Sequence, residues 1–445
     1  MRRRYAVFAA LLAACGSESD GESAPPVSED RALEADFEEV YRIGGIAAEG
    51  WDAFTEIADL DFDARGHLYV RDEAGSSTRI VVVDGVGDLA AEFGRMGDGP
   101  GELRQVGQMV ARPEGGAVLV DTGHRAYLLF SPDGSFERAL RFADTGGVRA
   151  GSAQIVRSAR DGGALFLTRS ASASLSQGEA SVSSGDRTIY GVALDEREEA
   201  VPIPFAEGWE PRPQRQVTIE AADPSDMFAA LDGAIAYFDP RLVFDVLPGG
   251  GVAYSDSSAF AVKIRTADAP PRVVGRPLHP QAVTDRLRER ARTRVLEEYE
   301  ASVEEQFTTS DLGGDVPEAF RAQFAALMES MLAGMREMVE NAAFMPEVPL
   351  VRDLRTTWEG TIWVQRWGSD PLAQVEFPGS GLGTDEAADG WIDVLAAEGE
   401  YVGTFSLEET PMPAAFGPGG IVAFVETDEF DVPTIIVKRV PEAVR

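Results

Sequence analysis

The sequence predicts an all-β fold, a six-bladed β-propeller with a helical hairpin inserted between blades 4 and 5. A glycine followed by a run of β-forming residues recurs six times along the chain. The early copies are spaced regularly, with 50 residues from Gly66 to Gly116 and 47 from there to Gly163. Tight-turn residues stand at matching places in these units. Units of about 40–50 residues with four short strands are typical of β-propellers.

The repeat positions define the strands expected in the first two blades. The six copies begin at Gly66, Gly116, Gly163, Gly250, Gly360 and Gly420. Blade 1 is expected to use residues 57–63, 67–72, 78–84 and 88–93, and blade 2 residues 107–112, 117–121, 126–131 and 135–142. Turns such as Pro132-Asp-Gly134 carry the aspartate and glycine that tight hairpins need.

The last blade lacks a fourth strand in its own repeat. After the β-forming run Thr434–Val440 the sequence continues for only five residues. The segment Phe37–Ile43, near the start, is β-prone and belongs to no other blade. We therefore expect this segment to complete blade 6, which closes the ring and removes two exposed sheet edges.

One part of the repeat resembles a known family. A glycine-rich connector, Phe93–Leu103, is followed by the corner Val118–Arg125 and the turn Leu129–Gly134. This order is similar to that of NHL-repeat-type six-bladed propellers, although His124 stands where the family usually has asparagine. The match covers residues 57–142 and fades afterwards, so the resemblance implies the fold rather than a particular function.

The start of the chain predicts a secreted lipoprotein. Three arginines after Met1 precede a short apolar run, Tyr5–Ala14, which is too short to span a bilayer. The run ends in Leu12-Ala-Ala-Cys-Gly16, which resembles a bacterial lipobox, and Cys15 is the only cysteine. Residues 1–14 are therefore expected to be a signal peptide and Cys15 the site of lipidation. The alternative is an ordinary signal peptide followed by a chance cysteine.

The residues after Cys15 predict a tether in the cell envelope. Residues 16–36 are acidic, rich in serine and glycine, and show no apolar pattern, so residues 15–36 are expected to be a lipidated, disordered tether. The propeller then occupies residues 37–445. No aspartate follows the cysteine, which favours the outer membrane, with the protein on its periplasmic side or its surface. The protein is expected to contact the membrane through the lipid on Cys15.

Composition restricts the kinds of partner. The chain has 75 acidic and 40 basic residues, a formal net charge of −35. A surface of this charge repels the phosphates of nucleic acid, so no nucleic-acid partner is expected.

The long connections are expected on one face of the propeller. Residues 170–186, 206–240, 277–348 and 368–390 all fall between the second and third strands of a blade or between successive blades. In a propeller these two kinds of connection lie on the same face. Insertions that cluster on one face of a repeat array typically mark the binding face.

The largest insertion, residues 283–344, predicts a helical hairpin. Its helices are expected over 283–306 and 317–344, with Gly313-Gly314 at the turn. The second helix carries a stripe at helical spacing, made of Phe320, Phe324, Met328, Met331, Met335 and Met338. This stripe is favoured as the packing face of the hairpin. A soft metal or a flexible apolar ligand is the alternative occupant.

Two pairs of charged residues stand at corners between second and third strands. Asp72 with Arg79, and Asp121 with Arg125, can form carboxylate–guanidinium bridges that brace a blade. His124 stands beside the second pair. Bracing is the favoured role of these residues, and contact with a ligand is the weaker alternative.

Catalytic signatures are sparse. The three histidines, His67, His124 and His279, fall in different parts of the repeat, and His67 is expected on the face opposite the insertions. No motif of a serine hydrolase, zinc protease or phosphate-binding loop is present. The acidic run Glu426–Asp431 could hold Ca²⁺ or another divalent metal, although a solvated loop is favoured. No cofactor is predicted.

The sequence therefore favours a binding or scaffold module over an enzyme. The module would present its insertion-rich face to a protein, a peptide or a glycan. The alternative is a metal-dependent propeller hydrolase or lyase of the lactonase-like class, with its metal in the central channel.

Overall fold

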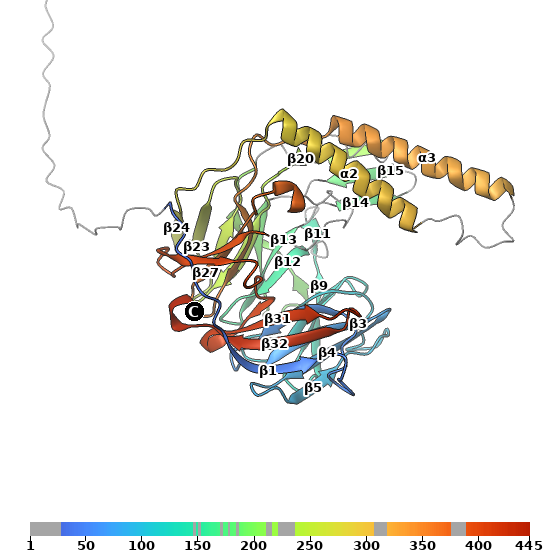
Figure 1. Ribbon diagram of the computed structural model, residues 1–445. Coiled ribbons are helices and arrows are strands. Elements are labelled where there is room, and N and C mark those ends of the chain that lie inside the picture. The colour runs from blue at the N-terminus through green and yellow to red at the C-terminus, as the bar shows by residue number, and fades with distance from the viewer. Residues whose placement is uncertain are drawn as a thin grey trace, which may run out of the picture.

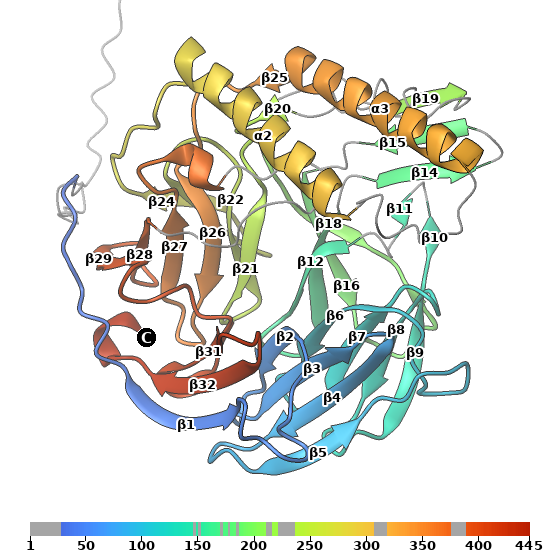
Figure 2. The ribbon, with the colours of Figure 1, turned by 45° about the vertical axis from the view of Figure 1, so that its right-hand side comes forward.

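The computed structural model describes residues 28–145, 148–149, 153–169, 172–176, 179–183, 187–210, 216–220, 236–306, 318–374 and 389–445. Within these residues, six sheets stand radially around a common axis (Figures 1 and 2). The hairpin lies between the fourth and fifth sheets along the chain. The predicted six-bladed propeller and the position of its helical insertion are confirmed.

The strands of each blade run antiparallel, and their order from the axis outward follows the chain except for the outermost strand of blade 6. The first three blades are β2 (Ile57–Phe62), β3 (Leu68–Ala74), β4 (Ser77–Val83) and β5 (Leu89–Phe93); β6 (Val106–Ala111), β7 (Ala117–Asp121), β8 (Ala126–Phe130) and β9 (Phe136–Phe142); and β12 (Ala153–Ser158), β13 (Ala164–Arg169), β16 (Thr188–Ala193) and β18 (Ile203–Glu207). A short strand, β17 (Glu199–Ala200), pairs in parallel with β9.

The last three blades follow the same order. They are β21 (Val243–Leu247), β22 (Gly251–Ser255), β23 (Ala261–Thr266) and β24 (Ala269–Gly275); β26 (Val351–Thr356), β27 (Ile362–Arg366), β28 (Trp391–Leu395) and β29 (Tyr401–Ser406); and β30 (Ala415–Phe416), β31 (Ile421–Thr427) and β32 (Pro433–Arg439), joined by β1 (Glu38–Gly44).

Glycine recurs before the second strand because the turn there needs a left-handed backbone. Gly66, Gly116 and Gly360 have φ of 82°, 90° and 101°. A residue with a Cβ rarely adopts these values, whereas glycine does so freely. In blade 3 the left-handed position falls one residue earlier, at Gly162 with φ 78°. The repeat recognised in the sequence is therefore a repeat of one turn geometry.

Adjacent blades pack face to face through apolar side chains. Between blades 1 and 2, Tyr69 and Ile80 meet Leu119 and Leu128, and all four are buried. The Tyr69 hydroxyl accepts a hydrogen bond of 2.7 Å from the backbone N–H of Gly116 in the next blade. Each such side chain contributes about 1.5–3 kcal/mol when fully buried. The apolar contacts between adjacent blades therefore contribute substantially to the stability of the ring.

The N-terminal strand closes the ring, as expected from the incomplete last repeat. Strand β1 pairs antiparallel with β32, and Ile43 lies opposite Ile435. Both side chains are buried in a cluster that also contains Leu68 and Val70 of blade 1. Blade 6 is thus built from both ends of the described chain, and it packs directly on blade 1.

Residues just before β1 lie against blade 5, which corrects the tether boundary drawn from the sequence. Ala32 forms a parallel bridge with Thr404, and the N–H of Leu33 donates to the carbonyl of Thr404 at 2.8 Å. The segment from Glu29 to Asp36 therefore contacts the propeller instead of extending freely. Residues 1–27, including Cys15, lie outside the described residues.

A charged clamp fixes this segment at Asp30. Its two carboxylate oxygens accept hydrogen bonds from Arg276 Nη1 at 2.8 Å and from Arg366 Nη2 at 2.9 Å. Both arginines also contact the fully buried Asp393. Partial burial works to raise the pKa of Asp30, but the hydrogen bonds from the two arginines outweigh it and lower that pKa. We call these four residues the Asp30 clamp.

The long insertions emerge on one face, which we call the insertion-bearing face (Figure 1). They occupy connections between second and third strands or between successive blades. They contain β10 (Asp144–Thr145) and β11 (Val148–Arg149), the sheet of β14 (Ser172–Ser176), β15 (Glu179–Ser183) and β19 (Gln216–Glu220), the pair β20 (Ala236–Tyr237) and β25 (Ala343–Phe344), the helices α2 (Asp285–Gln306) and α3 (Glu318–Asn341), and the 3-10 turn η2 (Pro371–Gln374). This placement agrees with the expectation from the sequence.

The helical hairpin is anchored to the propeller at its base. The first helix begins two residues after the expected position, and the second ends three residues before it. Met335 and Met338 are buried against Leu287 and Tyr237, so this part of the stripe packs inside the insertion. The side chains of Phe320, Phe324, Met328 and Met331, and the turn at 313–314, lie outside the described residues. Neither described helix is long and apolar enough to span a membrane.

Truncation should distinguish the residues before Ser28 from strand β1, which closes the ring. A chain that begins at Ser28 should melt at the temperature of the full chain, because the Asp30 clamp and β1 both remain. A chain that begins at Gly45 should melt more than 10 °C lower, because blade 6 loses its outer strand and Ile435 loses its covering side chain. Thermal unfolding followed by circular dichroism checks this.

A chain that begins at Glu38 serves as the intermediate control. It keeps β1 but lacks Asp30, so Arg276 and Arg366 share one carboxylate instead of two. It also lacks Leu33 and Phe37, which pack on blades 5 and 6. We therefore expect its melting temperature to lie between those of the chains that begin at Ser28 and Gly45. Equal melting temperatures for the chains that begin at Ser28 and Gly45 would contradict closure by β1.

Candidate functional site

The innermost strand of each blade leaves one edge unpaired along the axis. Backbone N–H groups on such an edge need acceptors, because a buried and unpaired polar group costs free energy. Side chains of the preceding blade supply them. Asp59 Oδ2 accepts from Met109 N at 2.9 Å, Asp61 Oδ2 from Ala111 N at 2.9 Å, Gln108 Oε1 from Val156 N at 2.9 Å and Asp245 Oδ2 from Thr356 N at 2.7 Å.

The inner strands enclose a cavity of about 270 Å³, which we call the channel cavity. All six blades contribute to its wall. Apolar side chains such as Leu60, Met109 and Phe416 form part of this wall, and charged side chains form the rest. Ligand sites in proteins combine a mainly apolar wall with a few placed polar groups. The channel cavity is therefore the candidate functional site.

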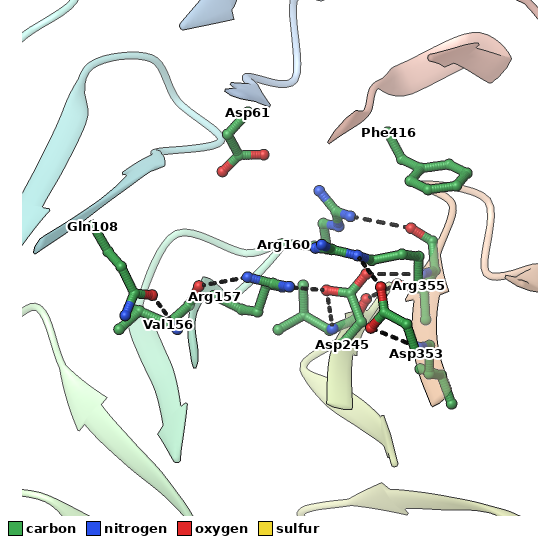
Figure 3. Close-up of polar contacts among 12 residues, drawn as sticks. Asp61, Gln108, Val156, Arg157, Arg160, Asp245, Asp353, Arg355 and Phe416 are labelled. Atoms are coloured by element: carbon green, nitrogen blue, oxygen red, sulfur yellow. Dashed lines mark hydrogen bonds and ion pairs between the residues drawn. The ribbon is translucent and has the colours of Figure 1, made fainter. Parts of the chain in front are cut away.

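Two arginines in the cavity are held by neighbouring carboxylates (Figure 3). Arg157 Nε lies 3.2 Å from Asp245 Oδ1, and its Nη1 donates to the carbonyl of Val156 at 3.0 Å. Arg355 Nε donates to Asp353 Oδ2 at 3.3 Å. The two arginines come from blades 3 and 5, and Asp245 comes from the blade between them.

A third arginine in the cavity rests on an aromatic ring. The guanidinium of Arg160 lies 4.3 Å from the ring centre of Trp358. The Trp358 indole N–H donates to the carbonyl of Phe416 at 2.8 Å, which fixes the ring. Arg160 Nη2 also makes a long hydrogen bond of 3.5 Å to the carbonyl of Thr356. No carboxylate of the described residues lies within ion-pair distance of Arg160, so its charge is compensated only partly.

Burial changes the proton affinities in the cavity. It raises the pKa of Asp61 to about 6, against the lowering effects of Arg160 and of backbone hydrogen bonds. Burial lowers the pKa of Arg157, and the nearby positive charge of Arg355 lowers it further. Burial also acts to lower the pKa of Arg355, but Asp353 and Asp245 raise it overall. The cavity therefore concentrates charge of both signs where water screens it weakly.

The first pair of residues singled out in the sequence braces blade 1. Arg79 Nε donates to Asp72 Oδ2 at 2.9 Å, between facing positions of β3 and β4. The other oxygen of Asp72 accepts from the N–H groups of Thr55 and Glu56 at 2.8 and 3.0 Å. These contacts link β3 to β4 and to the segment before β2, as expected for a bracing role.

The second corner, in blade 2, uses a different partner from the one expected. Asp121 Oδ2 lies 2.9 Å from His124 Nδ1, and Asp121 also accepts from the backbone N–H groups of Arg104, Gln105 and His124. Arg125 holds a left-handed backbone conformation with φ 55°. The His124 ring nitrogen therefore helps to hold the Asp121 carboxylate at this corner.

Sequence reasoning placed its candidates at these corners and missed the channel. None of Asp72, Arg79, Asp121, His124 and Arg125 lines the channel cavity. The first strands of blades 1 and 5 carry charges at alternate positions, in Asp59-Leu-Asp61 and Asp353-Leu-Arg355, but the first strands of the other blades do not repeat this pattern.

The residues considered for a metal site lie apart. His67 Nδ1 is 3.5 Å from Asp63 Oδ2 at a turn on the face opposite the insertions, whereas His124 lies at its blade 2 corner. In the acidic run, Asp428 Oδ1 accepts from the N–H groups of Phe430 and Val432 within its own turn. In the part of the chain that the structure describes, no three histidine, cysteine or acidic side chains are grouped to hold a metal ion.

Comparisons with known proteins return structures only. No protein-family model matches the chain, and no curated protein matches it. Similar solved structures include a member of the DUF4221 family from Bacteroides vulgatus (9% identity, 92% of this chain and 98% of that one, TM-score 0.45), a Bacteroides fragilis protein (10%, 93% and 98%, 0.45) and virginiamycin B lyase from Staphylococcus aureus (7%, 89% and 98%, 0.36). At these identities and TM-scores, none of them bears on the function of this chain.

We expect Asp61 to make stability depend on pH. Because its pKa is raised from 3.8 to about 6, the folded state binds a proton between these values that the unfolded state has released. Its contribution to stability is therefore present below about pH 4 and is lost as the pH rises to about 6.

The variant Asp61→Asn, which cannot ionise, checks this. The unfolding free energy of the variant minus that of the wild type should increase by about 1–3 kcal/mol from pH 4 to pH 7. The altered hydrogen bonds of the variant add the same amount at both pH values, so they do not affect this increase. Urea unfolding at the two pH values measures the difference, with Asp195→Asn at an exposed turn as the control. The prediction fails if the unfolding free energies of the wild type and of Asp61→Asn change by the same amount between the two pH values.

Proposed function

We propose that this chain is a lipid-anchored binding module of the bacterial cell envelope, an NHL-repeat-type propeller that docks a protein, peptide or glycan on its insertion-bearing face. One observation carries the proposal. The long insertions emerge on a single face, while the turns on the opposite face stay short. Variable connections held by a rigid scaffold are where binding residues concentrate.

Exposed apolar side chains on the same face support the proposal. Ile46, Trp209 and Phe430 are 68%, 46% and 65% exposed. They stand after β1, after β18 and between β31 and β32, all at the end of the propeller that carries the insertions. Aromatic and large apolar residues of this kind act as anchors when a partner covers them. The net charge of −35 further favours such partners over nucleic acid.

The proposed anchor would keep this face close to the membrane. The Asp30 clamp joins the chain to Arg276, directly after β24, and to Arg366, at the end of β27, both at the insertion-bearing face. Only 14 residue steps separate Cys15 from Glu29. A chain of this length reaches at most about 50 Å. A partner in or near the membrane is therefore within reach of the face.

Replacing the lipidated cysteine tests the anchor. Cys15→Ser should abolish incorporation of labelled fatty acid and move the protein from the membrane fraction to the soluble or unprocessed fraction. This is expected because diacylglycerol is attached to the cysteine thiol, which serine lacks. Labelling and fractionation of cells measure both effects. Retention of lipid by the variant would overturn the lipoprotein assignment.

Replacing the helical hairpin tests the binding face. Residues 281–283 and 346–348 are joined by backbone hydrogen bonds, so the two ends of the insertion lie side by side. A short Gly/Ser linker in place of residues 285–341 can therefore close the gap at modest entropic cost. We expect the blades to unfold at nearly the same temperature, because the cluster around Leu287 and Tyr237 is separate from the clusters between blades.

Binding should respond quite differently from stability. Immobilised wild-type protein is exposed to a detergent extract of the producing cells' envelope and to a glycan array, and the hairpin variant is compared with it. The variant should lose the wild type's ligand by more than tenfold, whereas Val86→Ser, on the opposite face, should keep it. Equal binding by wild type and hairpin variant would contradict the proposal. A variant that does not fold would show that the hairpin belongs to the core.

A further inference from the structure

Three arginines meet in the channel of a strongly acidic protein. Arg157, Arg160 and Arg355 line the channel cavity together with Asp61 and Asp245. Figure 3 shows the arginine side chains gathered around Asp245, with Asp61 on the other side of the cavity. With 75 acidic residues against 40 basic ones in the whole chain, such a group of guanidinium ions needs a specific reason.

The carboxylates of the channel are largely engaged by backbone groups. Asp61 accepts from the N–H groups of Phe62 and Ala111, and Asp245 accepts from those of Val246 and Thr356. Both oxygens of each residue therefore already hold a hydrogen bond. The unpaired inner edges of the blades explain why these carboxylates are present, and of the two only Asp245 also pairs with one of the three arginines.

The arginines, in contrast, have donors to spare. A guanidinium carries five N–H donors. Within the described residues, each of the three arginines makes one hydrogen bond, to Val156, Thr356 or Asp353 respectively. The Nε atom of Arg160 is buried without a hydrogen-bond partner, and that of Arg157 faces Asp245 Oδ1 at 3.2 Å without forming a hydrogen bond. Buried donors of this kind indicate a missing acceptor.

Apolar side chains form another part of the cavity wall, beside polar ones such as Gln108 and Ser158. Met109, Val156 and Phe416 line it beside the arginines. The volume of about 270 Å³ is just below the usual range for ligand sites, which begins at about 300 Å³. An occupant must therefore be small, with an anionic group for the arginines and a short apolar part for this wall.

We propose that the channel cavity binds a small organic anion, a carboxylate or phosphate with a short apolar substituent, through Arg157, Arg160 and Arg355. Guanidinium groups bind these anions in bidentate geometry, and they do so more strongly away from bulk water. Arg160 is the principal contact, because it has no carboxylate partner among the described residues and Trp358 holds its plane in place. This site is separate from the partner face proposed above.

Isothermal titration of the full-length protein in a neutral detergent tests the site. The probes are hexanoate, hexyl phosphate and hexylammonium, which share one tail, and inorganic phosphate, which has none. We expect hexanoate or hexyl phosphate to bind with one site per chain and hexylammonium not to bind. The stronger of the two anions identifies the head group, and weaker binding of inorganic phosphate shows the contribution of the apolar wall.

Variants distinguish the channel from other basic sites. Arg160→Gln should weaken anion binding at least tenfold, because charged hydrogen bonds are lost, and Arg355→Gln should weaken it as well. Arg197→Gln, at an exposed turn of the same blade, should have no effect. Circular dichroism verifies that each variant is folded. Equal binding of hexylammonium, unchanged affinity in Arg160→Gln, or no saturable binding of any anion would overturn the proposal.

Discussion

The unpaired inner edges of the blades are the constraint from which the chemistry of this propeller follows. Each blade can pair its strands outward, but its first strand faces the axis, where no further strand can join. The backbone groups there take acceptors from the neighbouring blade, as Asp59 and Asp61 do for β6 and Asp245 does for β26. Acidic side chains are thereby fixed inside the channel, and a cavity forms between them.

Negative charges buried in the channel are stabilised by positive charges nearby, and these positive charges form part of the channel wall. Burial of Asp61 raises its pKa, which shows that the charged form is costly there. Arg157 and Arg355 lie close to Asp245 and Asp353 and offset part of that cost. Arg160 adds a further positive charge, and it forms no ion pair with any carboxylate that the structure describes. An acidic protein thus acquires an arginine-lined centre.

The sequence was sufficient to predict the fold because turn geometry repeats. The glycines that begin each copy are needed for a left-handed turn, so they survive where strand sequences diverge. Closure by β1 was predictable as well, because one blade lacked a strand and one β-prone segment lacked a blade. Both inferences depend on local backbone requirements, namely glycine at a left-handed turn and β-forming residues in a strand, which can be recognised in the sequence.

The Asp30 clamp and the channel could not be recognised in this way. Residues 28–36 contain no apolar pattern, and they are held by Arg276 and Arg366, which are 246 and 336 residues away from Asp30 along the chain. Arg157, Arg160, Asp245 and Arg355 each look like an ordinary polar position of a strand or turn. Their meaning depends on the radial arrangement that brings blades 3, 4 and 5 to one axis, and no local pattern encodes that arrangement.

Arg160, the principal contact proposed in the channel, lies at the end of the axis away from the proposed partner face. Arg160 and Trp358 stand in turns between first and second strands, on the face away from the hairpin, and they share no buried cluster with it. Strand β26 is the direct covalent link between the two sites. It begins ten residues after α3 ends and carries Arg355 into the cavity. Trp367, directly after β27, and Leu372 also belong to the hairpin's buried cluster. Among the described residues, blade 5 therefore offers the most direct route by which a docked partner could influence a channel ligand.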